Sequence, residues 1–182
     1  MLNEAVNRAT TEETEGANTP QKVVHLVRQV GPIALDPCSN AGSLVNADRA
    51  VCLPEDGLAV NWYESTRWKA GYPHDAAPSS KAALGIAYVN PPYGRKMSAW
   101  IEKCIQEANR GTEIISLLPA RPGSRWFQQV FHTAQAICFW AGRLRFEGAP
   151  ASAPFDSALA YYGTRQDRFR EVFGAHGTVV LL

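Results

Sequence analysis

The sequence predicts a single α/β domain whose sheet is mostly parallel and ends in antiparallel strands. Short apolar runs of strand length alternate with longer segments in which apolar residues recur at a helical period. Two later strand-like runs, residues 136–140 and 143–146, are joined by Ala141 and Gly142, which predicts a hairpin. A chain of 182 residues, 46% of them hydrophobic, is long enough for one well-buried core and short for two.

The net charge of the chain limits how it can bind nucleic acid. A formal net charge of +1 gives no general electrostatic attraction to DNA, so any contact must come from local basic clusters. Arginines outnumber acidic residues from Arg121 to the C-terminus, and Arg143 and Arg145 are the best candidates for DNA contact. The later arginines, Arg165, Arg168 and Arg170, are better explained as a solvated helix face.

The composition indicates a reducing cytoplasm and no metal centre. The four cysteines have no paired metal-ligand spacing and lie in or beside apolar runs, which predicts buried free thiols. The four histidines show no mutual spacing typical of metal ligands. Residues 1–18 are polar and acidic and do not resemble a signal peptide, and no run of about eighteen apolar residues predicts a membrane span.

The chain begins with an expected polar arm, residues 1–18, which has little apolar surface to bury. Thr19 offers a capping hydroxyl and Pro20 suits the first helical position, so a helix is predicted from about Pro20 to Val30. Gly31 ends it. Residues 32–35 then form a short buried strand that brings Asp36 to its carboxyl end, where ligands of open α/β sheets bind. An Asx-turn or helix cap would also explain Asp36.

The second strand-helix unit must be abbreviated. Only twenty positions separate Asp36 from Asp56, too few for a full helix and strand with two loops. Residues 63–83 are rich in proline, glycine and serine and predict a long surface loop, whose basic and aromatic residues could face DNA. The only glycine in residues 37–43, directly after Asp36, is Gly42, so a glycine-rich nucleotide-binding fingerprint is absent.

The rest of the chain is arranged around Asn90, Pro91, Pro92 and Tyr93, where the apolar run of residues 85–89 stops. Two prolines cannot continue a strand, so a rigid loop begins there. An exocyclic amino group needs an acceptor for each hydrogen; the Asn90 side chain and a backbone carbonyl supply two, and the Tyr93 ring can stack. These residue types also form plain turns, but the whole tetrapeptide favours a site for a flat amine.

Helix and strand continue to alternate towards the C-terminus. Residues 97–110 carry one apolar helical stripe, residues 114–118 form a buried strand, and Ser124 can cap a helix reaching about Thr133. Residues 157–162 predict a strand, residues 166–173 a helix and residues 178–182 a last strand.

Asn-Pro-Pro-Tyr resembles the catalytic motif of amino-group methyltransferases that use S-adenosylmethionine. The ordered set of motifs resembles phage-type, Dam-like DNA adenine-N6 methyltransferases over about residues 19–163. The motifs are Asp36 to Asn40, Asp56 to Leu58 with Trp62, Asn90 to Gly94 with Trp100, Leu118 to Arg121 with Arg125 to Phe127, Gly142 to Phe146, and Pro154 to Ala158. The resemblance implies a Rossmann-like methyltransferase domain over residues 19–182, with S-adenosylmethionine as cofactor, DNA as partner, and a bacterial or phage-infected cytoplasm.

The resemblance also implies roles for single residues. It assigns cofactor binding to Thr19, Pro20, Asp36, Pro37, Cys38, Asn40, Asp56 and Leu58. It assigns catalysis to Asn90, Pro91, Pro92 and Tyr93. The expected substrate-binding residues are Arg121, Arg143 and Arg145, and no metal is expected. Thr19 and Pro20 would lie against the amino-acid end of the donor, while Asp56 would hold its adenosine. Glu55 is an adjacent competitor for that role.

Two other functions remain open at this point. The same acceptors would suit another planar amine, the cytosine N4 or a glutamine amide. A catalytically silent DNA- or donor-binding module is also possible, because the glycine fingerprint is missing and Asp156 stands where the family favours proline.

Overall fold

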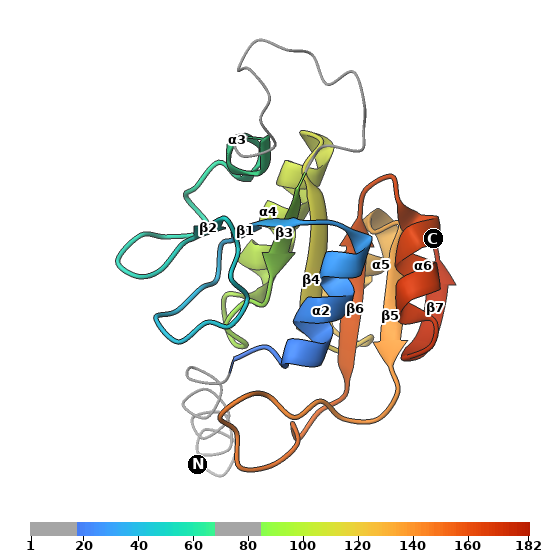
Figure 1. Ribbon diagram of the computed structural model, residues 1–182. Coiled ribbons are helices and arrows are strands. Elements are labelled where there is room, and N and C mark those ends of the chain that lie inside the picture. The colour runs from blue at the N-terminus through green and yellow to red at the C-terminus, as the bar shows by residue number, and fades with distance from the viewer. Residues whose placement is uncertain (1–17, 68–84) are drawn as a thin grey trace.

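The computed structural model describes residues 18–67 and 85–182, which form one seven-stranded sheet covered by helices (Figure 1). The helices are α2 (Gln21–Val30), α3 (Trp62–Arg67), α4 (Met97–Asn109), α5 (Arg125–Thr133) and α6 (Gln166–Phe173). The strands are β1 (Ile33–Asp36), β2 (Arg49–Ala50), β3 (Ile86–Val89), β4 (Glu113–Pro119), β5 (Ala136–Trp140), β6 (Ser157–Tyr162) and β7 (Gly177–Leu181). None of the described helices is long and apolar enough to cross a membrane.

The sheet order is β2-β1-β3-β4-β6-β5-β7. The pairs from β2 to β4 are parallel, and β4 with β6, β6 with β5 and β5 with β7 are antiparallel. Strands β1 to β5 therefore point the same way, and β6 and β7 run against them. The α/β class and the antiparallel end of the sheet are confirmed. The two-residue strand β2 agrees with an abbreviated second unit.

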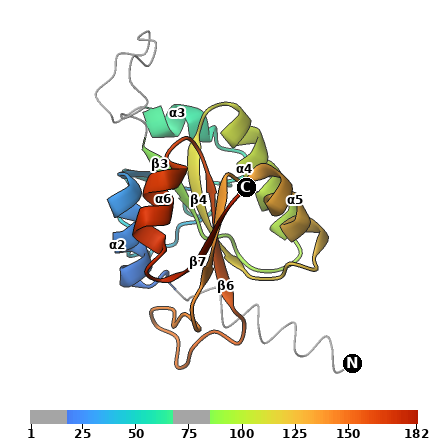
Figure 2. The same cartoon turned by 90° about the vertical axis from the view of Figure 1, so that its right-hand side faces the viewer.

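Two helical layers enclose the sheet, as the edge-on view shows (Figure 2). Helices α2 and α6 cover one face, and α4 and α5 cover the other. Strand β3 shows why both faces are apolar: Ile86 and Tyr88 pack into the core under α2, while Ala87 and Val89 pack into the core under α4. Burial on both sides is what turns these strands into continuous apolar runs in the sequence.

The expected hairpin of residues 136–140 and 143–146 is wrong. Strand β5 is already paired on both edges, by β6 and β7. Residues 143–146 instead follow Gly142, whose φ is +77°, and leave the sheet. Their alternation has another cause, because Leu144 and Phe146 are buried in the core under α2 while the residue before each of them, an arginine, is exposed.

Two further expectations change near the ends of the described segments. Residues 62–67 form helix α3 and not part of a loop, and residues 68–83 of that expected loop lie outside the described residues. The helix of residues 21–30 is present, but Pro20 is its N-cap and no side chain caps it. Thr19 is therefore not the capping residue, and its hydroxyl takes part in the site described next.

Candidate active site

The carboxyl ends of three neighbouring parallel strands bring the candidate residues to one edge of the sheet. Asp36 is the last residue of β1, Asn90 follows β3, and β4 ends at Pro119. Strand β6 begins at Ser157, opposite Pro119, so the loop of residues 141–156 also lies at this edge. Ligands of open α/β sheets bind outside such strand ends, and the positions of Asp36 and Asn90 match that rule.

The Asn90 side chain is held by hydrogen bonds at both of its polar atoms. Its Nδ2 donates to Thr19 Oγ1 at 3.2 Å, and the Tyr93 hydroxyl donates to its Oδ1 at 3.1 Å. The hydroxyls of Thr19 and Tyr88 lie 3.1 Å apart, and both residues are buried. Burial raises the pKa of Tyr88 and of Tyr93, so both phenols stay protonated. This network fixes which way the amide faces.

The Tyr93 ring is held by aromatic residues from the loop of residues 141–156. It meets Phe155 edge-on at 5.3 Å between ring centroids and Phe146 at 6.4 Å. Pro91 is buried and Pro92 is exposed, and neither has an N–H to compete for an acceptor. The tetrapeptide thus combines a fixed amide, stiff backbone and a braced aromatic ring.

Asp36 is a buried carboxylate held by neutral donors. Its exposed fraction is 3%; Cys38 N donates to Oδ1 at 3.1 Å and Ser43 Oγ to Oδ2 at 3.2 Å. The contact with Cys38 N is the Asx-turn that the sequence left open. No lysine or arginine of residues 18–67 and 85–182 forms an ion pair with Asp36. Burial raises the pKa of Asp36, against the lowering effect of these hydrogen bonds.

The turn of Asp56 to Leu58 lies directly against the loop that follows β1. A Cβ on Gly57 would stand 1.9 Å from the carbonyl oxygen of Pro37, so only glycine permits this approach. Leu58 N donates to Asp56 Oδ1 at 2.9 Å, and Asp56 is exposed. Leu58 and Cys38 pack against the same core cluster. The Glu55 carboxylate instead pairs with Arg49 at 2.7 Å.

Cys38 joins the loop after β1 to the segment that begins at Asn90. Burial raises the pKa of its thiol, with a further raising effect from Asp36 and a lowering hydrogen bond from the Asn90 backbone. A protonated, half-buried thiol is a poor nucleophile, so Cys38 is a packing residue beside Asn90 and Asp36.

Sequence reasoning did not identify one residue at this edge of the sheet, Asn18, because it placed residues 1–18 in the polar arm. Asn40 Nδ2 donates to Asn18 Oδ1 at 3.0 Å, and Asn18 Nδ2 donates to the carbonyl of Gly42 at 2.7 Å. Asn18 also forms an antiparallel bridge with Glu147. It therefore links the loop after β1 to the loop of residues 141–156. An asparagine directly before Thr19 and Pro20 was the available signal.

The candidate arginines lie around the site without reaching the Asn90 amide. Arg143 Nε is 3.7 Å from Asp156 Oδ1, and the Asp156 carbonyl accepts from Ala120 N at 2.7 Å, next to Arg121. Arg145 Nε donates to the carbonyl of Ala149 at 3.4 Å. All three arginine side chains are exposed. An exposed ion pair of this kind adds little stability, so these side chains are available to another anion.

No group of three or more histidine, cysteine or acidic residues in the described part of the chain is arranged to hold a metal ion. A family model described as DNA N-6-adenine-methyltransferase (Dam) matches residues 7–160, a range that contains every candidate site residue. No curated protein matches the chain.

Proposed function

The chain belongs to the DNA N-6-adenine-methyltransferase (Dam) family, and on that basis we propose that it methylates the N6 amino group of adenine in DNA, with S-adenosylmethionine as donor. We further propose a Rossmann-like methyltransferase fold for residues 19–182, preceded by a polar arm. The observation that carries the proposal is the Asn90 amide, fixed between Thr19 and Tyr93 at the carboxyl edge of the sheet.

Methylation of the adenine amino group depends more on how the nitrogen is positioned than on a general base. The lone pair of the adenine amino nitrogen is delocalised into the ring, so the nitrogen is a poor nucleophile. Asn90 Oδ1 accepts one hydrogen bond from Tyr93 and keeps capacity for a second, from one N6 hydrogen. The Pro91 carbonyl would accept the other. Held this way, the nitrogen can pyramidalise, and its developing positive charge faces two carbonyl oxygens.

The bonds formed and broken in the proposed methyl transfer can all be accounted for. The donor supplies a methyl group on a sulfonium. As the adenine nitrogen forms its bond to that methyl carbon, the bond from carbon to sulfur breaks, and one N6 proton leaves to water. The role of the protein is to keep the Asn90 oxygen, and not its NH2, turned towards the amine, which the contact from Nδ2 to Thr19 supports.

The residues on the donor side fit a cationic nucleoside. Asp36 is a buried carboxylate that no cationic side chain of the described residues pairs, and the ammonium of the donor would offset that desolvation. Asp56 has an exposed carboxylate suited to ribose hydroxyls, and Leu58 an apolar side chain suited to the adenine face. Thr19 and Pro20 stand at the N-terminus of α2, which favours a carboxylate. Pro37, Cys38 and Asn40 shape the intervening loop.

DNA would approach over the loops that carry the exposed arginines. A base inside a duplex cannot reach Asn90, so the target adenine must leave the stack, and stacking on Tyr93 would offset the cost of unpairing. Arg121, Arg143 and Arg145 would contact phosphates, which position the duplex without reading its sequence.

One experiment tests the proposal and its rivals together. Purified protein is incubated with methyl-tritiated S-adenosylmethionine and unmethylated DNA, and the DNA is digested to nucleosides. We expect the label in N6-methyl-2′-deoxyadenosine, and about a thousandfold less of it with Asn90→Ala. Label in N4-methyl-2′-deoxycytidine would identify the cytosine amine, and N5-methylglutamine formed when a protein acceptor replaces the DNA would identify a glutamine amide. Donor binding without any methylated product would identify a silent module.

A further inference from the structure

The turn of Asp56 to Leu58 is held from behind by a buried tryptophan. Trp62 Nε1 donates to the carbonyl oxygen of Gly57 at 2.8 Å, and Trp62 is fully buried. That carbonyl belongs to the peptide unit whose N–H, on Leu58, donates to Asp56 Oδ1 at 2.9 Å. Both ends of one peptide plane are therefore fixed. Rotation of this plane would break both hydrogen bonds and turn the Asp56 carboxylate.

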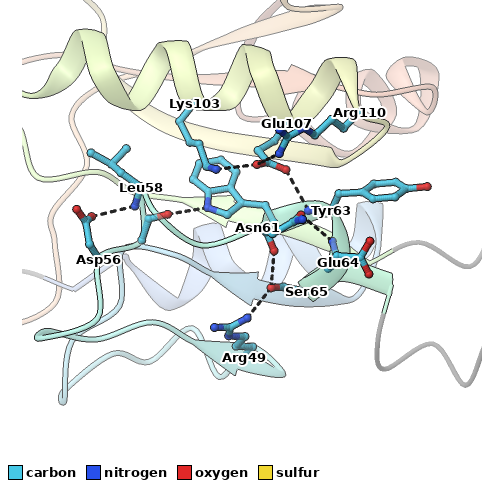
Figure 3. Close-up of polar contacts among 12 residues, drawn as sticks. Arg49, Asp56, Leu58, Asn61, Tyr63, Glu64, Ser65, Lys103, Glu107 and Arg110 are labelled. Carbon is cyan, nitrogen blue, oxygen red and sulfur yellow. Dashed lines mark hydrogen bonds and ion pairs between the residues drawn. The ribbon is translucent and has the colours of Figure 1, made fainter. Parts of the chain in front are cut away.

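Trp62 is itself fixed by helix α4. Its ring stacks on Trp100, with centroids 6.2 Å apart and planes 26° from parallel, and Lys103 Nζ lies 5.6 Å from its ring centroid. Lys103 donates to the buried carboxylate of Glu107 at 2.7 Å, and the same carboxylate accepts from Tyr63 N at 3.1 Å (Figure 3). The start of α3 is thus tied to α4, which fixes where the indole N–H points.

We propose that Trp62 is a positioning residue for the adenosine half of the methyl donor. It acts through the peptide plane from Gly57 to Leu58, which orients Asp56 and presses the turn against Pro37. The inference rests on the proposed function, because it takes Asp56 and Leu58 as the residues that meet adenosine. Trp62 touches neither the donor nor the reacting atoms.

The chain offers a matched control in Trp100. It is buried, belongs to the same stacked pair and loses the same atoms when it is changed to phenylalanine. Its Nε1, however, has no hydrogen-bond partner among the residues that the structure describes. Trp62→Phe therefore removes ring area and a hydrogen bond to the turn, whereas Trp100→Phe removes ring area that packs beside Gly57 and an N–H without a partner in the described part of the chain. Because both variants remove packing near this turn, a larger effect of Trp62→Phe reports the hydrogen bond to Gly57.

Binding of S-adenosylmethionine and of S-adenosylhomocysteine is measured by calorimetry for the wild type and both variants. Because both ligands carry adenosine, Trp62→Phe should weaken both alike, by roughly five- to tenfold in Kd, through the unpaired carbonyl. Trp100→Phe should stay within about twofold of the wild type. In kinetics, Trp62→Phe should raise KM for the donor but leave kcat and KM for DNA within about twofold. Equal Kd values for the two variants would overturn the inference.

A second measurement needs no variant to fold. In the wild-type protein, hydrogen exchange of the Trp62 indole N–H should slow when S-adenosylmethionine is added, because the ligand stabilises the turn that accepts this bond. An unchanged exchange rate with bound donor would contradict the inference. A wild type that binds the donor but methylates nothing would refute the proposed function and leave this inference intact. A wild type that binds no donor would overturn both.

Discussion

The strands β1, β3 and β4 end at the carboxyl edge of the sheet and begin at its amino edge, and each edge holds a buried carboxylate with different partners. At the amino edge, Glu113 is the first residue of β4; it forms an ion pair with Arg165 and accepts a hydrogen bond from the Tyr161 hydroxyl. Arg165 Nη1 also donates to the carbonyl of Val30 at 3.1 Å, at the end of α2. At the carboxyl edge, Asp36 is equally buried but receives neutral donors only.

We interpret this difference as one between a structural site at Glu113 and the proposed ligand site at Asp36. Burying a charge is costly unless a partner offsets the lost hydration. Glu113 has that partner within the fold and joins β4 and β6 to α2 and α6. Asp36 lacks one among the described residues, and its pKa is raised by desolvation. A buried carboxylate without a cationic partner lowers the stability of the fold, and a bound cationic ligand would recover that stability.

The largest expected effect is at the carboxyl edge. Asn90→Ala should lower kcat by about a thousandfold, because the proposed acceptor for the adenine amino group is lost. The Kd for S-adenosylmethionine and the melting temperature should change little. Asn109→Ala, at an exposed residue at the end of α4, is the matched control. Equal loss of donor affinity in Asn90→Ala would show that this residue holds the donor.

The amino edge should show the reverse behaviour. Glu113→Gln leaves the Arg165 charge without its carboxylate and should lower the free energy of unfolding by about 3 kcal/mol, measured by urea denaturation. Methyl transfer by the folded fraction should stay at the wild-type level. Glu171→Gln breaks an exposed pair with Arg168 and should cost under about 1 kcal/mol. A drop in kcat for Glu113→Gln at full folding would mean that the two edges are coupled.

Much of the scaffold could be predicted because it depends on local patterns. Strand β3 has an apolar run buried on both faces, and α4 has a single apolar stripe, so periodicity was enough for both. The strand-end position of Asp36 followed from the same patterns. Residues 143–146 show where this approach fails: alternation reports burial on one side of an extended chain and does not report which strand, if any, it pairs with.

The contacts that make the site depend on residues far apart in the chain. Thr19 and Asn90 are 71 positions apart, and Asn18 reaches Glu147 by a backbone bridge. A hydroxyl before a proline predicts a helix cap in any local reading, and only the three-dimensional arrangement shows that Thr19 faces the Asn90 amide. The resemblance pointed to the tetrapeptide of residues 90–93, but the side chains that hold the Asn90 amide could not be found by spacing.

A smaller effect on catalysis is expected from the contact between Thr19 and Asn90. Thr19→Val keeps the shape of the side chain but removes the acceptor for Asn90 Nδ2, so the amide can rotate and present its NH2 to the amine. We expect kcat to fall by about tenfold, the size of one lost hydrogen bond. Thr19→Ser keeps the hydroxyl and should retain most activity. A change in donor Kd with kcat unchanged would show that the Thr19 hydroxyl serves the donor alone and does not orient the Asn90 amide.

The smallest expected effect is a gain in stability at Asp36. A carboxyl group whose pKa is raised in the folded state stabilises the fold fully below its ordinary pKa, and this contribution is lost as the pH rises through the raised value. Asp36→Asn should therefore raise the melting temperature of the ligand-free protein at pH 7, on the order of 2 °C, and have less effect at acidic pH. Asp167→Asn, at an exposed site on α6, should change neither. The same Asp36 variant should bind S-adenosylmethionine more weakly, and wild-type affinity should fall as acid protonates Asp36. A variant that is less stable at pH 7 would make Asp36 a structural carboxylate like Glu113, and the contrast between the two edges would fail.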